Sequence, residues 1–173
     1  MTRLEILRRP VESDSVPLFP YVFRSRVVDQ LAWDGPESAE SFHAEWAQIV
    51  KRSEEGRNHF FVIVDDVARV PAGACSVRCK DTAGDLGIWL GEPFQGRGLG
   101  TSAIAELVTY SLERLELSRL EATIFVGNWP SRRAFEKNGF LLERTLERSS
   151  LKLGVLRDEW RLALPNASKV RGA

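Results

Sequence analysis

Hydrophobic and polar residues alternate with a period of two along much of the chain, which is typical of half-buried β-strands. This alternation predicts five short strands, over residues 3–9, 59–66, 72–79, 85–91 and 119–126. Near the C-terminus it continues through two longer stretches, 140–154 and 155–164, which meet around Gly154. The last two strands are therefore predicted to form a hairpin, with the glycine in its turn.

Apolar residues three or four positions apart predict the helices. The clearest helix starts after Asp34 and Pro36 and has on one face Ala39, Phe42, Trp46, Ile49 and Val50. Residues 14–33 are ambiguous, because Pro17 and Pro20 break the start of the segment; a modest helix is predicted over 22–33.

Two further helices follow the middle of the chain. One begins at Gly98 and keeps an apolar stripe to Leu115. A shorter one has Asn128 as its N-cap and ends at Gly139 in the left-handed conformation. The complete order, β-α-α-β-β-β-α-β-α-β-β, predicts an α+β fold.

Composition narrows the classes of function. A chain of 173 residues with 43% apolar and 28% charged residues is expected to form a single domain, 1–165, followed by a flexible polar tail, 166–173. The 24 basic and 24 acidic residues cancel, so neither nucleic acid nor an acidic membrane is indicated as a partner.

Targeting and metal-binding signals are absent from the sequence. No apolar run approaches the roughly 20 residues of a membrane helix, and the charged start does not resemble a secretory signal, so we expect a cytoplasmic location. Cys75 and Cys79 have no second Cys/His pair to complete a zinc site. They are predicted to be small apolar fillers on one face of a strand, with no metal.

The stretch FQGRGLG, 94–100, places three glycines on alternate positions between a strand and a helix. The free amides and the dipole at a helix N-terminus attract anions, and glycines let a phosphate approach them. A diphosphate cradle is one interpretation, with Arg97 gripping phosphate oxygens. A tight turn that needs glycines for its own geometry is the other. The spacing fits neither the dinucleotide fingerprint nor the P-loop, which requires a lysine.

Two motifs together point to a family. QGRGLG (95–100), preceded by DLGIWLGEPF and followed by NWPSRRAFEKNGF and the closing GVLRDEWRLAL, resembles the GNAT superfamily of N-acetyltransferases, in particular the RimJ/RimL branch of ribosomal-protein N-terminal acetyltransferases. The resemblance covers 84–164 well. It implies a mixed, mostly antiparallel sheet of six to seven strands, flanked by about four helices, with a central pair of splayed strands.

The same resemblance implies the ligands and the reaction. Acetyl-CoA would be the cosubstrate, and a primary amine, of a protein N-terminus or a small molecule, would attack its thioester directly. Relatives often dimerise, and the terminal EWRLAL strand is a candidate for pairing across a two-fold axis. A non-catalytic acyl-CoA-binding or sensing module is the alternative function.

The family pattern assigns roles to residues of this chain. The pyrophosphate would be bound by Gln95, Gly96, Arg97, Gly98, Leu99, Gly100 and Thr101. Backbone groups near Trp89 and Leu90 would hold the pantetheine arm and polarise the thioester carbonyl. Asn128 matches an asparagine that bonds the arm, and Ser131 matches a position whose hydroxyl faces the sulfur. Each of these residues also has an alternative structural role. Trp89 would pack in the hydrophobic core, Asn128 would only cap its helix, and Ser131 would face solvent.

One departure concerns the proton donor. Many relatives have a tyrosine where this chain has Phe135, and phenylalanine cannot protonate the departing thiolate. Ser131 or a water would take over the donation, or the thiolate would leave without help.

The general base that deprotonates the amine is not determined by the pattern. Asp85 is the first candidate, because relatives place an acidic residue at the start of this strand. Glu92, Glu143, Glu147, His43 and His59 are further candidates, each of which also reads as a surface or structural residue.

Acceptor recognition would come from the first helices and the last hairpin. Two sets of residues each have two interpretations. An aromatic acceptor pocket or ordinary core packing would account for Tyr21, Phe23, Trp33 and Trp46. Contact with an acidic acceptor or with solvent alone would account for Arg24 and Arg26.

Overall fold

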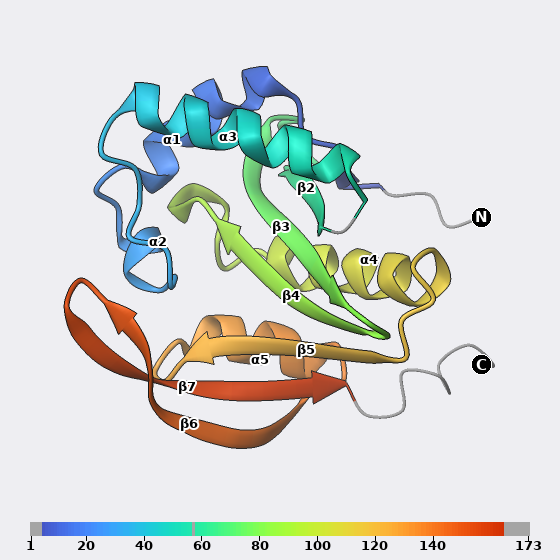
Figure 1. Cartoon of the computed structure of the whole chain (residues 1–173). Helices are drawn as coiled ribbons and strands as arrows, with labels where there is room; N and C mark the ends of the chain where they lie inside the picture. Colours follow the sequence, from blue (N-terminus) through green and yellow to red (C-terminus); the bar gives the residue numbers. More distant parts are fainter. Residues whose placement is uncertain (1–4, 57, 165–173) are drawn as a thin grey trace.

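Seven strands form one mixed sheet in the computed structural model, which describes residues 5–56 and 58–164 (Figure 1). The strand order is β1-β2-β3-β4-β5-β7-β6, and all neighbours are antiparallel except β4 and β5. The strands are β1 (Leu7–Arg8), β2 (Asn58–Val64), β3 (Pro71–Lys80), β4 (Ala83–Leu90), β5 (Arg119–Phe125), β6 (Leu141–Lys152) and β7 (Val155–Leu164). The α+β, mostly antiparallel architecture is the predicted one; the start of the predicted first strand, 3–4, lies outside the described residues.

Helices cover both faces of the sheet. They are α1 (Ser15–Val22), α2 (Arg26–Asp29), α3 (Ala39–Glu54), α4 (Leu99–Glu113) and α5 (Trp129–Lys137), with two short 3₁₀ turns, η1 (Glu12–Asp14) and η2 (Glu92–Phe94). In Figure 1, α1 and α3 lie over β2 and β3, while α4 and α5 lie behind the sheet. In the described part of the chain, no helix combines the length and the apolar character that crossing a membrane requires.

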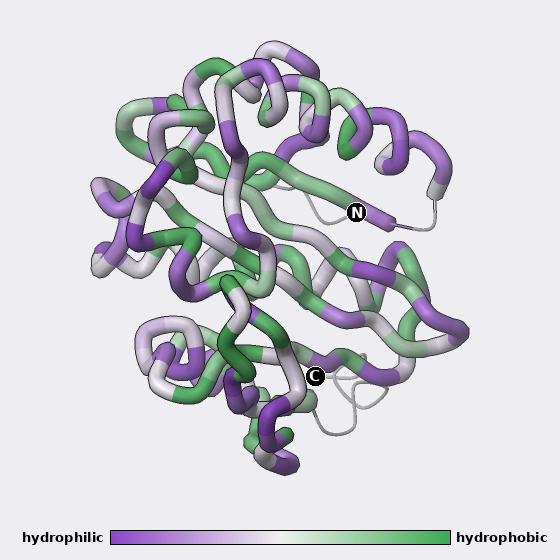
Figure 2. The backbone as a smooth tube through the Cα atoms, turned by 60° about the vertical axis from the view of Figure 1, so that its left-hand side comes forward, coloured by the Kyte–Doolittle hydropathy of each residue, from purple (hydrophilic) through white to green (hydrophobic). Residues whose placement is uncertain are grey.

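Two hydrophobic clusters fill the spaces between sheet and helices. The larger one joins the sheet to α4 and α5 and includes Leu107, Phe135 and Phe140, each at most 2% exposed. The smaller one joins β2 to α1 and α3 through Leu18, Phe42 and Val62, among others. The tube in Figure 2 changes between hydrophobic and hydrophilic residues along strands and helices, as expected where each element buries one face. Cys75 and Cys79 belong to the larger cluster, as predicted.

Local sequence signals place α3 and α5 as predicted. The Ser38 hydroxyl accepts a hydrogen bond from the Ser41 amide at 3.1 Å and starts α3. The Asn128 side chain accepts one from the Ser131 amide at 3.3 Å and starts α5. Gly139 follows α5 with φ +85°, the left-handed conformation expected for a residue that ends a helix.

The prediction for residues 22–33 was wrong. A helix, α1, already runs through Pro17 and Pro20 and ends at Val22, and only four residues of the predicted helix form α2. Pro17 lies in the first turn, where no amide is needed, and the hydrogen bond lost at Pro20 is offset by burial of Leu18 and Val22, both 0% exposed. The segment then turns at Arg24, whose φ is +49°.

The two parallel strands β4 and β5 are splayed, as the resemblance implied. They pair only at Ala83–Arg119, Gly84–Leu120 and Asp85–Glu121. β4 continues to Leu90 paired with β3 alone, while β5 continues to Phe125 paired with β7 alone. A gap therefore opens between the two strands toward their C-terminal ends, at the centre of the sheet.

Strand order excludes one predicted contact. EWRLAL lies in β7, and β7 is paired with β5 on one edge and with β6 on the other. Both of its edges are satisfied within the chain, so the prediction that this strand pairs across a two-fold axis was wrong. The strand at that edge of the sheet is β6.

Candidate active site

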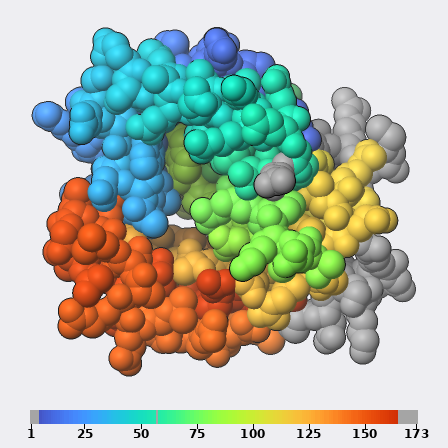
Figure 3. All heavy atoms as spheres, in the orientation of Figure 1, coloured from blue at the N-terminus to red at the C-terminus, as the bar shows by residue number. Residues whose placement is uncertain are grey.

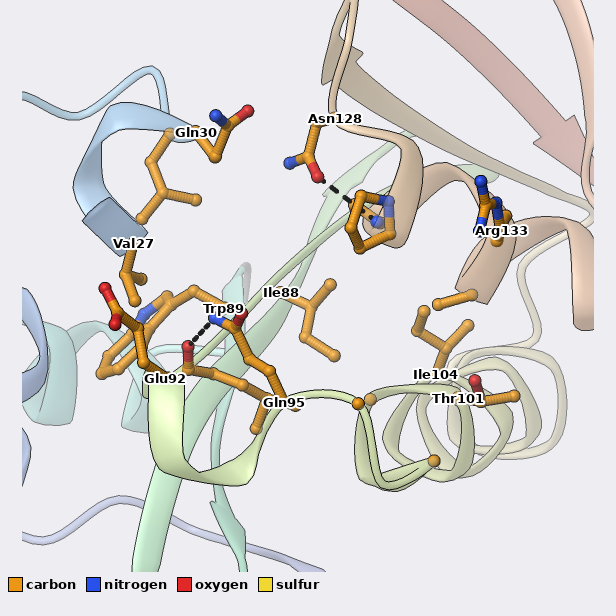
Figure 4. Close-up of a pocket in the computed structure, with 18 of the residues that line it drawn as sticks. Val27, Gln30, Ile88, Trp89, Glu92, Gln95, Thr101, Ile104, Asn128 and Arg133 are labelled. Atoms are coloured by element: carbon orange, nitrogen blue, oxygen red, sulfur yellow. Dashed lines mark hydrogen bonds between the residues drawn. The ribbon is translucent and has the colours of Figure 1, made fainter.

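A cleft of about 760 Å³ lies where β4 and β5 splay apart, and it reaches α2, α4 and α5. Figure 4 shows side chains from all three helices and from β4 converging on it. Nine of the predicted site residues line the cleft: Trp89, Leu90, Gln95, Gly96, Gly98, Gly100, Thr101, Asn128 and Ser131. Arg97, Leu99 and Asp85 do not line it.

The glycine turn leaves the N-terminus of α4 bare. Gly96 and Gly98 have φ of +75° and +87°, and a Cβ built on either would meet no atom within 4 Å. The first helical amide bond runs from Ser102 to the Gly98 carbonyl at 3.0 Å, so the amides of the preceding turn have no helical acceptor. Open space, free amides and a helix dipole coincide at this point, which suits an anion.

Arg97 points away from this space. Its guanidinium pairs with Asp65 at 2.5 Å and lies over the Phe94 ring at 5.5 Å. Hydrogen bonds from the Val67 amide, together with Arg97, lower the pKa of Asp65 despite its burial. Arg97 therefore ties the glycine turn to the end of β2, and its side chain is not available to grip a ligand in this arrangement.

The start of the turn is fixed to β4. Gln95 donates from its side-chain amide to the Leu90 carbonyl at 2.8 Å, as drawn in Figure 4. On the other side of β4, Gly73 allows β3 to approach closely, because a Cβ there would lie 2.2 Å from the Trp89 carbonyl. The backbone at Trp89 and Leu90 is thus held between β3 and the glycine turn.

The splayed strands supply unpaired backbone groups. Beyond Asp85, the edge of β4 that faces β5 has no strand partner in the described structure. Unpaired amides and carbonyls along a strand bind an extended chain in the manner of an added strand. The length from Leu86 to Leu90 is therefore suited to a linear, amide-containing arm.

The opposite wall of the cleft is the N-terminus of α5. Asn128 uses its side-chain oxygen as the helix cap, which leaves its amide hydrogens for a ligand. Ser131 lines the cleft in the first turn of α5. Asn138 donates to the Thr101 carbonyl at 3.0 Å and to the Ala134 carbonyl at 2.9 Å, and so fixes α5 against the start of α4.

Phe135 is a core residue. Its ring is 2% exposed, packs edge-on against Phe140 at 5.1 Å between centroids, and is not among the residues that line the cleft. The hydroxyl in the cleft on this helix is that of Ser131.

Of the carboxylates proposed as the general base, one lines the cleft and the others lie outside it. Glu92, in the 3₁₀ turn after β4, is the one carboxylate among the lining residues. Asp85 pairs with Arg78 at 2.6 Å; its other oxygen is buried without a hydrogen-bond partner among the described residues. Glu143 is bound by Arg119 at 2.6 Å. Glu147 lies on β6, on the exposed edge of the sheet.

Both histidines are engaged away from the cleft. His43 Nδ1 lies 2.6 Å from the Ser15 hydroxyl, and His59 Nδ1 lies 3.1 Å from the Tyr110 hydroxyl. Burial and the nearby Arg9 lower the pKa of His59, which favours the neutral form of its ring. Neither residue lines the cleft.

Sequence reasoning missed two cations at the cleft. Arg133 and Lys137, four residues apart on α5, both line it. Their i, i+4 spacing on a short helix was the available signal, since it puts both on one face. Val27 of α2 and Gln30, the residue that follows α2, were missed because that segment was expected to be part of a longer helix. Of the predicted acceptor residues, Arg26 lines the cleft, whereas Tyr21 packs against Phe94 and Phe23 against Phe19.

Comparison with known proteins gives a family and a set of structural relatives. The family model described as an acetyltransferase (GNAT) domain matches residues 5–141. YdaF of Bacillus subtilis (strain 168), whose assignment as a ribosomal N-acetyltransferase is itself provisional, is 42% identical over 59 residues, which cover 34% of this chain and 32% of YdaF. Human alpha/beta-tubulin-N-acetyltransferase 9 is 34% identical over 93 residues, covering 51% of this chain and 45% of the human protein. The matches thus span less than half the length of these relatives.

Solved structures share the fold. RimL, the ribosomal L7/L12 alpha-N-protein acetyltransferase, was solved in complex with coenzyme A; it superposes with a TM-score of 0.81 at 23% identity, over 91% of this chain and 91% of RimL. At this level of identity the likeness supports the arrangement of strands and helices and does not extend to the ligand.

Proposed function

The chain belongs to the GNAT acetyltransferase family, and on that premise we propose that it is an N-acetyltransferase that transfers an acetyl group from acetyl-CoA to a primary amine. The observation that carries the proposal is the open glycine turn at the N-terminus of α4, next to a splayed strand edge. The open glycine turn would bind the diphosphate, and the splayed strand edge would bind the pantetheine arm. The RimL complex with coenzyme A is consistent with this use of the fold.

Different residues of the cleft would bind different parts of the cofactor. The amides around Gly98, Gly100 and Thr101 would bind the diphosphate. Arg133 and Lys137, on the α5 wall of the cleft, would bind the remaining phosphate of CoA; Arg26 lines the cleft on its α2 side. The unpaired edge of β4 would hold the pantetheine amides, and an amide near Trp89 or Leu90 would donate to the thioester oxygen as negative charge develops on it.

Transfer would proceed by direct attack. The neutral amine nitrogen forms a bond to the thioester carbon, the carbon–sulfur bond breaks, and the amine loses a proton. A free amine has a pKa near 10 and is almost wholly protonated at pH 7, so a base is needed. We assign this role to Glu92 in preference to Asp85, because Glu92 lines the cleft. Ser131 is the candidate that donates a proton to the thiolate.

A second candidate function is binding without turnover. It is favoured by Phe135, which replaces the proton donor of many relatives by a buried phenyl ring. Turnover separates the two functions. Purified protein is incubated with acetyl-CoA and a panel of amines (N-terminal peptides, polyamines, aminoglycosides and amino acids), while free thiol is followed and the products are identified by mass. Acceptor-dependent thiol release with an N-acetylated product supports the enzyme; tight acetyl-CoA binding with no release for any amine supports the binding module.

A further inference from the structure

A second pocket, of about 300 Å³, lies on the face of the sheet that α3 covers. Its walls are mainly aromatic: Trp33, Phe42, Trp46 and Trp89, with Ile49. Phe42 and Trp46 form its buried side, each 3% exposed, and Trp46 is fixed by a hydrogen bond from its indole to the Val11 carbonyl at 2.9 Å. Trp89 lines this pocket as well as the cleft, so one residue borders both cavities, and its backbone is the one assigned to the thioester.

The loop residue Trp33 is held in place by two contacts, one to its backbone and one to its ring. Lys152 Nζ donates to the Trp33 carbonyl at 2.6 Å and lies 3.3 Å from Asp34. The Trp33 ring stacks on Phe42, with centroids 6.2 Å apart and planes at 30°. A tryptophan between two helices is thereby fixed as a wall.

Lys152 has an unusual position for a lysine. It ends β6 at the tip of the last hairpin, yet its side chain is only 4% exposed. Burying an ammonium group costs free energy unless it is well paired. Here that burial joins the hairpin tip to the loop between α2 and α3, 119 residues earlier in the chain. Figure 3 shows the molecular surface hollowed between α2, the strands β3 and β4, and this hairpin.

The charges at the pocket argue for an uncharged occupant. Glu45 and Arg52 both line it, one acidic and one basic, so neither sign dominates. Burial, and to a smaller degree Glu37, raise the pKa of Glu45, while the nearby Trp33 indole lowers it in part. Apart from these two charges and the neutral Gln48, the lining is apolar and mostly aromatic, and such a surface gains most from covering apolar area.

We propose that this pocket, formed by Trp33, Phe42, Trp46 and Trp89, binds a large apolar substituent of the acceptor amine. The proposal rests on the proposed transfer of an acetyl group, because it places the substituent beside an amine at Trp89. Lys152 is a positioning residue that acts through Trp33. The preferred acceptor therefore carries an aromatic or long aliphatic group close to its amine, on a peptide or on a small molecule.

The test compares acceptors that differ only in this group. Peptides that begin with Phe, Leu, Ala, Gly or Lys, and the small amines phenethylamine and ethylamine, are assayed for kcat/KM at saturating acetyl-CoA. We expect Phe and Leu to exceed Gly by roughly tenfold or more, the usual gain from filling an apolar pocket. Comparing the peptides with phenethylamine and ethylamine shows whether the acceptor is a peptide or a small molecule. Equal rates across the series, or a preference for Lys, would overturn the proposal.

Variants locate the preference in the pocket. Lys152→Met and Trp33→Ala should lower kcat/KM for the preferred acceptor at least about tenfold, while the Gly peptide changes less than about threefold. Lys51→Ala, on α3 but outside the pocket, is the control. Folding is checked by thermal denaturation of each variant. An equal loss for large and small acceptors would contradict a role in recognising the substituent.

Binding of the product gives a readout that does not require turnover. N-acetyl-phenylalaninamide is titrated against the protein saturated with CoA, and tryptophan fluorescence and heat are measured. We expect saturable binding that Trp33→Ala weakens and Lys51→Ala does not. If the protein binds CoA but not N-acetyl-phenylalaninamide, the proposed pocket is overturned and the proposed function stands. If the protein does not bind acetyl-CoA, the proposed function itself is overturned.

Discussion

Substituting Gly98 by valine tests the cradle at its centre. Gly98 has φ +87° and open space where a Cβ would lie, so a branched side chain would project into the space assigned to the diphosphate. The same substitution at Gly56 provides a matched control. Gly56 has φ +81°, also has no atom within 4 Å of a built Cβ, and lies in the turn before β2, apart from the cleft.

The two variants should lose similar folding stability and differ only in their affinity for CoA. A valine at a left-handed position costs about 1–2 kcal/mol of folding stability, and this cost should appear in both. Binding should change only at Gly98. Losing two hydrogen bonds to a charged phosphate, at about 1.5 kcal/mol or more each, removes about 3 kcal/mol of binding free energy. Such a loss raises the Kd for CoA roughly 100-fold.

The assay is calorimetric titration of CoA into each variant, with urea denaturation of the same preparations. Gly98→Val and Gly56→Val should lose similar stability, and only Gly98→Val should lose affinity. A folded Gly98→Val protein that binds CoA as the unmodified protein does would refute the assignment of this turn to the diphosphate. Equal weakening by both variants would show that strain, and not the filled cradle, causes the loss.

Three further predictions concern the base, the N-terminal strand and pH. Glu92→Gln should lower kcat by roughly 100-fold with little change in CoA affinity, whereas Asp85→Asn should lower it by less than about threefold; the opposite ranking would move the base to Asp85. Glu106 accepts hydrogen bonds from the amides of residues 5, 6 and 7 at 3.1–3.3 Å, so Glu106→Ala should cost about 3 kcal/mol in urea denaturation, and a loss below about 0.5 kcal/mol would contradict that role. His59 has a lowered pKa in the folded protein, so the stability it contributes is complete above its unfolded pKa of about 6.5 and is lost as the pH falls below that value. His59→Gln should therefore show a smaller fall in Tm between pH 7 and pH 5 than the unmodified protein, and an unchanged fall would contradict the assignment.

The predictable parts of the structure are those determined by neighbouring residues. The glycine turn before α4, the Asn128 cap and Gly139 all act within one or two helical turns, and each was predicted at the position where the structure has it. The resemblance added the splayed pair of strands, which no local pattern contains.

The parts that were missed depend on contacts between distant residues. Arg97 is paired with Asp65, 32 residues earlier, and so the guanidinium does not point into the cradle. β7 inserts between β5 and β6, which satisfies both edges of the strand that had been expected to dimerise. Pro20 inside α1 is tolerated because tertiary burial outweighs a local penalty. Lys152 reads as a surface residue in the sequence, and only the folded chain brings it to Trp33.

The most direct test of the central claim is a calorimetric titration of acetyl-CoA into the purified protein, with pantetheine as the comparison ligand. We expect one site per chain for acetyl-CoA and much weaker binding of pantetheine, because pantetheine lacks the phosphates that α4, Arg133 and Lys137 would bind. No detectable binding of acetyl-CoA, or equal affinity for the two ligands, would contradict it.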